Sequence, residues 1–235
     1  MVVRVDCEPH RQELRDRVTV AKRLMEATKP NLPSLDDDQG VSFAFPDDVS
    51  REARGLAVVL LFAAYEHLLT SLCRSLLEAA ARSRARARRL KPGIQLFLVH
   101  GELAGLADGG RRKLWKLSGP RLITALGERP AKELDPELFP DDGSFMKASQ
   151  VKVFCDIFDL GDPAPVLREV WDRINAIVDQ RNAVAHGRLR PEEVGRDYSH
   201  DEMLQLTASW EARWTDFLTW VESNCHGRAF YLAQR

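Results

Sequence analysis

Three polar residues near the end of a strongly helical stretch could carry out acid–base chemistry. In the segment IVDQRNAVAHG, residues 177–187, Arg181 is followed directly by Asn182 and five positions later by His186. The arginine is a permanent cation, the asparagine supplies an amide, and the histidine can accept or donate a proton near neutral pH. Such a set can cut a phosphodiester without a metal, by activating the ribose 2′-hydroxyl, stabilising the phosphorane and protonating the leaving oxygen. The product would carry a 2′,3′-cyclic phosphate.

The arginine stands where the helical pattern predicts an apolar residue. The preceding stripe comprises Leu167, Val170, Trp171, Ile174, Ile177 and Val178. Continuing this period places Arg181 on the same stripe. Because a guanidinium stays charged, it needs an anionic partner or a wet surface. A buried salt bridge is therefore the structural alternative to a catalytic role, and Glu66 is the partner we expect for it.

The histidine lies at the last turn of the same helix. Unpaired carbonyl groups at a helix C-terminus favour the protonated imidazole, so His186 could either act as a proton carrier or simply satisfy those carbonyls. Asn182 and His186 are four residues apart and share a helix face, whereas Arg181 and His186 diverge by roughly 140°. Gly187 is the expected end of the helix, since glycine adopts the left-handed conformation without steric cost.

The elements that position these residues follow from apolar spacing of three and four residues. A first helix is predicted from Glu8 to Thr28 and is ended by Lys29-Pro30. The stretch PNLPSLDDDQG is a predicted loop. A second helix is then expected to reach about Arg89, and its N-cap candidates are Asp47, Asp48 and Ser50. Its first part, GLAVVLLFAAYEHLLTSLC, is apolar on nearly all sides, which is typical of a central bundle helix.

Glycines and prolines interrupt the pattern from Pro92 to Pro140, which predicts short helices and loops. A helix is expected within SFMKASQVKVFCDIFDLG, with Met146 on its apolar face and Gly161 closing it. Asp162 followed by Pro163 predicts the start of the helix that carries Arg181. A final helix is predicted from about Asp201 to Asn224. No useful β-alternation occurs, so we expect an all-α bundle.

The predicted helices and their end signals also suggest the domain organisation. We expect one domain over residues 1–235, made of an N-terminal helix and loop (1–46), a central helix (47–90), an insertion (91–145) and the motif-bearing and C-terminal helices (146–226). A chain of 235 residues with 44% hydrophobic composition is long enough to bury a core.

The net charge, the cysteine positions and the lengths of the apolar runs limit the possible functions. A net charge of −1 means that any attraction to nucleic acid must come from local patches. The four cysteines are widely separated and show no zinc-ligand spacing, so neither a metal nor another cofactor is expected. The N-terminus lacks a signal-peptide pattern, and the longest apolar run, Leu56 to Tyr65, is about half of the ~20 residues that a membrane span needs. We therefore expect a cytoplasmic protein with reduced thiols and no membrane partner.

Two basic runs could supply such a patch. The first lies between Ser83 and Lys91 and the second between Gly109 and Lys116, where Trp115 could stack on a base. A solvated helix face explains the runs about equally well. The candidate RNA-binding residues are Arg84, Arg86, Arg88, Arg89, Arg111, Arg112 and Lys113.

The motif and its flanking helices resemble a known superfamily. RNAVAHG resembles the R-(polar)-x-x-x-H signature of the HEPN superfamily (higher eukaryotes and prokaryotes nucleotide-binding domains). LLFAAYEHLLTSLCRSLLEAA and DDGSFMKASQVKVFCDIFDLG are similar to the core helices of its RiboL-PSP-HEPN and MAE-type branch. The resemblance covers about Asp48 to Arg89 and Phe145 to Asn224. It implies a helical bundle that dimerises with its motif helices facing each other.

The same resemblance implies a metal-independent endoribonuclease of a toxin–antitoxin or anti-phage defence system, with an antitoxin protein as a further partner. Arg181, Asn182 and His186 take the catalytic roles by motif match, and residues that diverge within one helix can converge across a two-fold axis. One departure concerns a tyrosine that some members carry two positions after the histidine and that is a modification target. This chain has Arg188 there, which with Arg190 would extend a basic rim. The alternative function is a non-catalytic module that binds a nucleotide or a protein.

Overall fold

The chain folds almost entirely into helices. The computed structural model describes residues 5–29, 46–82, 85–107, 111–141, 143–225 and 230–232, with the backbone alone at 111–113. Within these residues the only β pairing consists of two isolated bridges, Arg86 with Pro130 and Leu90 with Tyr231. The predicted all-α class is confirmed. The predicted loop PNLPSLDDDQG lies outside the described residues.

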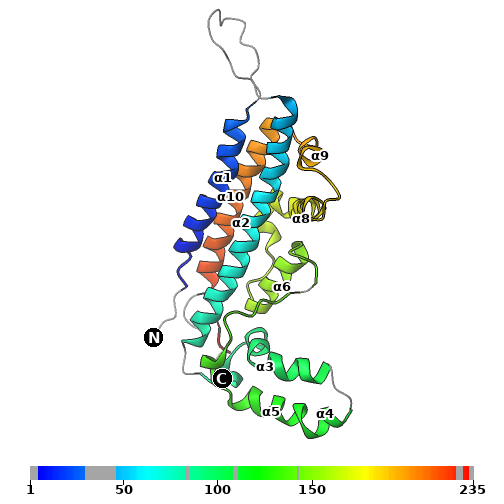
Figure 1. The fold of residues 1–235 in the computed structure, drawn as a ribbon. Coiled ribbons are helices and arrows are strands. Elements are labelled where there is room, and N and C mark those ends of the chain that lie inside the picture. The colour runs from blue at the N-terminus through cyan, green and yellow to red at the C-terminus, as the bar shows by residue number, and fades with distance from the viewer. Residues whose placement is uncertain are drawn as a thin grey trace, which may run out of the picture.

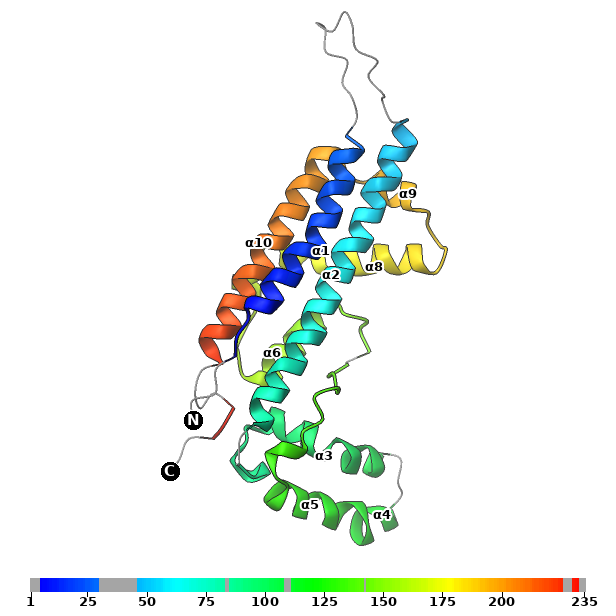
Figure 2. The ribbon, with the colours of Figure 1, turned by 60° about the vertical axis from the view of Figure 1, so that its left-hand side comes forward.

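Three long helices run side by side and form the bundle: α1 (Glu8–Ala27), α2 (Asp47–Ala81) and α10 (His200–Asn224) (Figures 1 and 2). Their shared core is rich in aromatic rings. Tyr65 of α2 lies 6.0 Å from Trp210 and 4.9 Å from Trp214, measured between ring centroids. All three side chains are fully buried, and large buried rings contribute strongly to burial energy.

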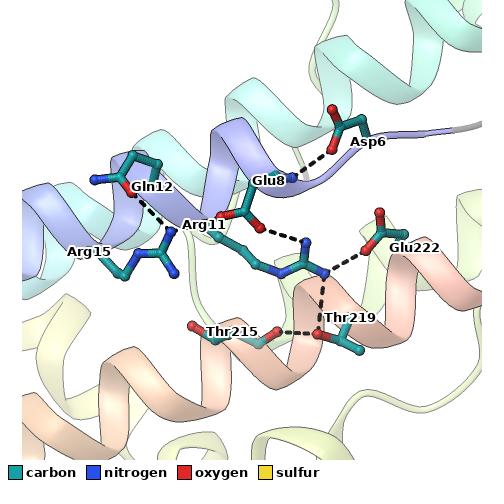
Figure 3. Close-up of polar contacts among 8 residues, drawn as sticks. All are labelled: Asp6, Glu8, Arg11, Gln12, Arg15, Thr215, Thr219 and Glu222. Atoms are coloured by element: carbon teal, nitrogen blue, oxygen red, sulfur yellow. Dashed lines mark hydrogen bonds and ion pairs between the residues drawn. The ribbon is translucent and has the colours of Figure 1, made fainter.

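An arginine on the outer side of the bundle joins its first and last helices. The Arg11 guanidinium donates to the Glu222 carboxylate at 2.6 Å and to the Thr219 hydroxyl at 3.3 Å, both on α10. It also contacts Glu8 on its own helix at 3.3 Å (Figure 3). The Arg11 side chain is largely shielded from solvent, which strengthens such a pair relative to an exposed one. The two termini of the fold are thereby linked.

The second helix begins and ends differently from the prediction. Its N-cap is Pro46, and Asp47, Asp48 and Ser50 all lie inside the first turn. It ends at Ala81, not near Arg89. Beyond it the backbone pairs with the segment after α5 (Ser118–Glu128), where the Ala87 amide donates to the Arg129 carbonyl at 2.8 Å. This pairing satisfies backbone groups outside a helix, so a tertiary contact overrides the helix propensity of the alanine-rich sequence.

The central helix is also apolar over a longer window than the run from Leu56 to Tyr65. Among the described helices, α2 alone is long and apolar enough to cross a membrane, judged by length and composition. The apolar window of α2 that meets this criterion is 18 residues long, and 56% of it is buried inside the fold. The helix packs against α1, α8 (Trp171–Ala185), α9 (Pro191–Gly195) and α10, as the core helix of a bundle does.

A helical arm extends beyond one end of the bundle (Figures 1 and 2). It comprises α3 (Pro92–Ala107), α4 (Arg111–Lys116) and α5 (Ser118–Glu128). The prediction of short helices holds for α4 and α5, whereas α3 is a full helix of 16 residues. Arg129, just after α5, makes a two-fold ion pair with Glu102 of α3, with distances of 2.5 and 3.0 Å.

Three predictions for residues 146–168 are wrong. Met146 lies ahead of α6 (Ala148–Phe158) and not on it. The left-handed residue that ends α6 is Asp159, with φ 55°, although Gly161 also has a positive φ. Finally, the expected continuous helix from Pro163 is broken at Arg168, whose φ of 48° separates α7 (Ala164–Leu167) from α8. The stripe residues Leu167, Val170, Ile174, Ile177 and Val178 are buried in the core, and Trp171 is partly buried against it.

A short helix packs on α2 through two glycines. A Cβ atom built on Gly55 would lie 1.9 Å from the Pro191 carbonyl oxygen, and one on Gly195 would lie 1.8 Å from the Arg51 oxygen. Arg54 adds a hydrogen bond of 2.9 Å from Nε to the Gly195 carbonyl. This close approach fixes α9, and with it the turn that follows α8.

Candidate functional site

The candidate residues lie at the free end of α8. This helix lies across the long helices, and its carboxyl end extends away from them before the chain returns to α9 (Figure 2). Gly187 has a φ of 67°, so the helix ends where the sequence predicted. Its amide donates to the Val184 carbonyl at 3.0 Å, and the Arg188 amide donates to the Ala183 carbonyl at 2.8 Å. Backbone hydrogen bonds therefore define the turn that presents His186.

Arg181 is held by contacts on three sides. Its Nη1 donates to the Asn182 Oδ1 at 2.8 Å, and its Nη2 lies 3.6 Å from a Glu66 carboxylate oxygen. Its central carbon lies 4.0 Å above the Phe62 ring, a cation–π contact. The side chain remains 31% exposed. The guanidinium is thus both oriented and accessible. The Glu66 pair expected from the sequence is present, but it is half-exposed and not buried.

His186 is exposed at the end of the helix and does not join the Arg181 cluster within one chain. It forms the C-cap of α8, where its own amide donates to the Asn182 carbonyl at 3.0 Å. Arg188 and Arg190 are exposed in the turn that follows. The Arg190 amide donates to Glu193, and its guanidinium lies 3.9 Å from Glu192. The structure therefore places Arg181 with its Glu66 and Asn182 contacts, and His186, on different sides of the helix end.

A pocket of about 300 Å³ opens beside Arg181. Its lining residues combine aromatic rings with carboxylates and an amide: Phe62, Glu66, Phe139, Asp141, Phe145, Met146, Gln150 and Arg181. A concave apolar surface with a few polar groups is the usual form of a small-molecule site. Sequence reasoning found only Arg181 and Glu66 of this set.

The signals for the remaining lining residues are weak. Phe62 lies four residues before Glu66, so the two share a face of α2, and this spacing could have identified it. Phe139 and Phe145 come from the irregular chain between the arm and α6, where no periodicity predicts a position. Only the tertiary structure brings them to Arg181.

The described parts of the two basic runs do not lie beside the polar residues of α8. Both views place the arm on the far side of α6 from α8 (Figures 1 and 2). Arg86 forms an ion pair with Glu128, and Arg88 lies 3.8 Å from the same carboxylate, so part of the positive charge is compensated. Arg89 and Trp115 are exposed. Arg84 and the side chains of Arg111, Arg112 and Lys113 lie outside the described residues.

Other reactive groups are buried or dispersed. The four cysteines are free and buried, and burial raises the pKa of the Cys73 thiol to about 12. Across the described ranges, no group of three or more His, Cys, Asp or Glu side chains is placed to hold a metal ion.

Comparisons of this chain with protein-family models, with curated proteins and with solved structures found no match.

Proposed function

We propose that this protein is a metal-independent endoribonuclease of the HEPN type that acts as a homodimer in the cytoplasm. The observation that carries the proposal is the uncovered end of α8. From Arg181 to Arg190 every residue is exposed or half-buried, although Val184, Ala185 and Leu189 are apolar. An apolar helix end beside a polar triad is suited to pairing with a second copy across a two-fold axis.

The pairing would complete the site. Within one chain Arg181 and His186 lie on different sides of the helix end, so one subunit alone provides only part of the chemistry. When two helix ends meet, His186 of the partner subunit can approach the same phosphate as Arg181. The Asn182 and Glu66 contacts hold the guanidinium ready for that phosphate, and preorganised charge is the main source of catalytic electrostatic stabilisation.

The proposed reaction is an internal phosphoryl transfer. A neutral imidazole of His186 accepts the proton of the ribose 2′-hydroxyl, and the 2′-oxygen forms a bond to phosphorus. Arg181 stabilises the charge that develops on the phosphorane oxygens. The bond from phosphorus to the 5′-oxygen then breaks, and that oxygen takes a proton from the protonated histidine of the dimer's other subunit. The products are a 2′,3′-cyclic phosphate and a 5′-hydroxyl.

The physiological role we propose is that of a toxin in a toxin–antitoxin or anti-phage defence system, restrained by an antitoxin protein. The exposed Arg188 and Arg190 would contact the RNA backbone at the rim of the site. Arg86, Arg88 and Arg89, in the segment that precedes α3, would hold RNA farther from the end of α8. Cleavage that survives neutralisation of both basic runs at low salt would remove those runs from the mechanism.

The test is RNA cleavage in the presence of a chelator by the wild type and by Arg181→Ala and His186→Ala. We expect cleavage by the wild type and none by either variant. His186→Ala removes only an exposed side chain, so it should leave unfolding unchanged. Arg181→Ala should cost roughly 1–2 kcal/mol, because its ion pair is half-exposed and its cation–π contact is modest. Cleavage that needs metal, or that persists in both variants, contradicts the proposal.

A second candidate is a non-catalytic binding module, and the completeness of the Arg181 contacts favours it. Glu66, Phe62 and Asn182 together explain an arginine on the apolar stripe without any substrate. If Arg181 is purely structural, Arg181→Ala would lower the free energy of unfolding, and His186→Ala would change neither stability nor function. Growth arrest on expression of the wild type, relieved by His186→Ala, would distinguish the nuclease from the module.

A further inference from the structure

The pocket beside Arg181 has a composition suited to a particular part of an RNA chain. Its walls carry the rings of Phe62, Phe139 and Phe145, and two carboxylates, Glu66 and Asp141, stand among them. Aromatic walls bind flat rings by stacking, whereas carboxylates bind groups that donate hydrogen bonds. A volume of about 300 Å³ lies at the small end of the range for ligand pockets.

Phe145 has the features of a stacking platform. The residue is 74% exposed, and its backbone has a φ of 54° and is followed by Met146 with a φ of 69°. Two consecutive residues other than glycine in the left-handed region cost conformational free energy. An exposed phenyl ring held in such a backbone does not contribute core burial that would offset this cost.

The surrounding contacts hold that backbone in place. The buried Tyr65 hydroxyl donates to the Met146 carbonyl at 2.7 Å. On the other side, Lys147 lies 2.9 Å from the Asp179 carboxylate, and the Ala148 amide donates to the Asn175 Oδ1 at 2.9 Å. Asn175 and Asp179 both belong to α8, so the helix that carries Arg181 also fixes the position of the loop.

The charges indicate which base fits. Glu66 and Asp141 can only accept hydrogen bonds when ionised, and the Asp141 Oδ1 already accepts from the Gly143 amide at 2.8 Å. Guanine presents two adjacent N–H donors, N1–H and the N2 amino group, which a carboxylate can receive side by side as it receives a guanidinium. Uracil presents carbonyl oxygens on both sides of its single N–H donor and would meet the carboxylates unfavourably.

We propose that this pocket binds an unpaired guanine base, stacked on Phe145 with its Watson–Crick edge toward the Glu66 and Asp141 carboxylates. The assignment of RNA as the ligand rests on the proposed nuclease function. Because Arg181 lines the same pocket, the base would bring its own phosphate to the end of α8. The pocket would thereby select the position in the RNA at which the chain is cut.

The experiment measures binding and cleavage separately. Binding of GMP, AMP, CMP and UMP to the full chain is followed by calorimetry, together with 2′-O-methyl oligonucleotides that contain one guanine and cannot be cleaved by 2′-oxygen attack. We expect GMP to bind at least about 10-fold more tightly than UMP. Phe145→Ala should weaken GMP binding roughly 5- to 100-fold, the range for loss of one base stack. Phe145→Tyr, which keeps an aromatic ring, should retain it.

Two further variants sharpen the result. Asp141→Asn keeps an oxygen for the Gly143 amide but removes the charge, so the preference for GMP over UMP should shrink. Ile123→Ala removes a comparably exposed apolar side chain on α5, at 71% exposure, and should leave nucleotide binding unchanged. Equal binding of all four nucleotides, or full GMP binding by Phe145→Ala, overturns the inference. So does a change of oligomeric state in Phe145→Ala with GMP binding intact, which would assign the ring to a subunit contact.

The inference and the nuclease proposal fail separately. Absence of cleavage in any RNA with GMP binding retained contradicts the nuclease and leaves the guanine pocket standing. Chelator-resistant cleavage with no preference for guanine positions, in a wild type that binds no GMP, contradicts the pocket alone.

Discussion

Substitution of Gly55 by alanine tests how α9 supports the end of α8 that carries Arg181 and His186. An added methyl group would lie 1.9 Å from the Pro191 carbonyl oxygen and 2.8 Å from its Cα, where ordinary contacts begin at 3.4 Å. Backbone atoms of α9 must therefore move by more than an ångström. Pro191 follows His186 by only five residues, so the turn between them must move as well.

Two free-energy contributions of opposite sign set the expected change in stability of Gly55→Ala. Replacing a glycine inside α2 by alanine favours the helix by about 1 kcal/mol. Overpacking a closely fitted contact typically costs about 1–3 kcal/mol, and rigid backbone places Gly55 at the upper end of that range. The net expectation is a loss of about 2 kcal/mol in the free energy of unfolding, with RNA cleavage reduced at temperatures where the variant is still folded.

The assay is urea unfolding followed by tryptophan fluorescence, with Gly101→Ala as the matched control. Gly101 also lies inside a long helix, α3, but a Cβ atom there would meet nothing within 4 Å. That variant should gain about 0.5–1 kcal/mol. If Gly55→Ala were as stable as the wild type, or if both glycine variants changed in the same direction, the close contact between α2 and α9 would be refuted.

Three further predictions concern charge and chemistry. Burial lowers the pKa of His200, so the unfolded chain takes up a proton more readily; stability is full above about pH 6.5 and falls as the pH drops below it. His200→Leu should reduce the loss of urea midpoint between pH 7.5 and pH 5.5, and an unchanged loss would remove this histidine as a cause. Arg181→Lys keeps a charge near Glu66 but loses the planar donor fork, so kcat/KM for RNA should fall roughly 10- to 100-fold; retained activity would show that charge alone suffices. Burial raises the pKa of Cys73 and of the other three thiols, so a thiol reagent should label the protein only on unfolding, and rapid labelling of the native chain would contradict the buried positions.

The sequence predicted most of the bundle because its helices carry strong local signals. The first and last helices lie within one residue of their expected bounds, since apolar spacing and clear end signals agree there. Prediction failed where a contact between distant residues overrides local preference. Residues 85–87, in the alanine- and arginine-rich stretch after α2, pair with residues 129–131 and do not continue the helix. The helix expected from Pro163 is also interrupted, by a positive φ at Arg168 that its apolar stripe does not indicate.

The candidate site likewise combines residues that local spacing identifies with residues that only tertiary packing places. Arg181 was identifiable because a charged residue interrupts an apolar period, and Gly187 because glycine readily adopts the left-handed conformation that often ends a helix. By itself the sequence therefore determined the helical class, the end of α8 and the polar triad on it, because these depend on residues a few positions apart. Only the tertiary structure decided that Phe145 and Asp141 stand beside Arg181, that α9 fits against Gly55, and that Arg181 and His186 stay apart within one chain. Those relations depend on packing between segments that are distant along the chain, and no local period encodes them.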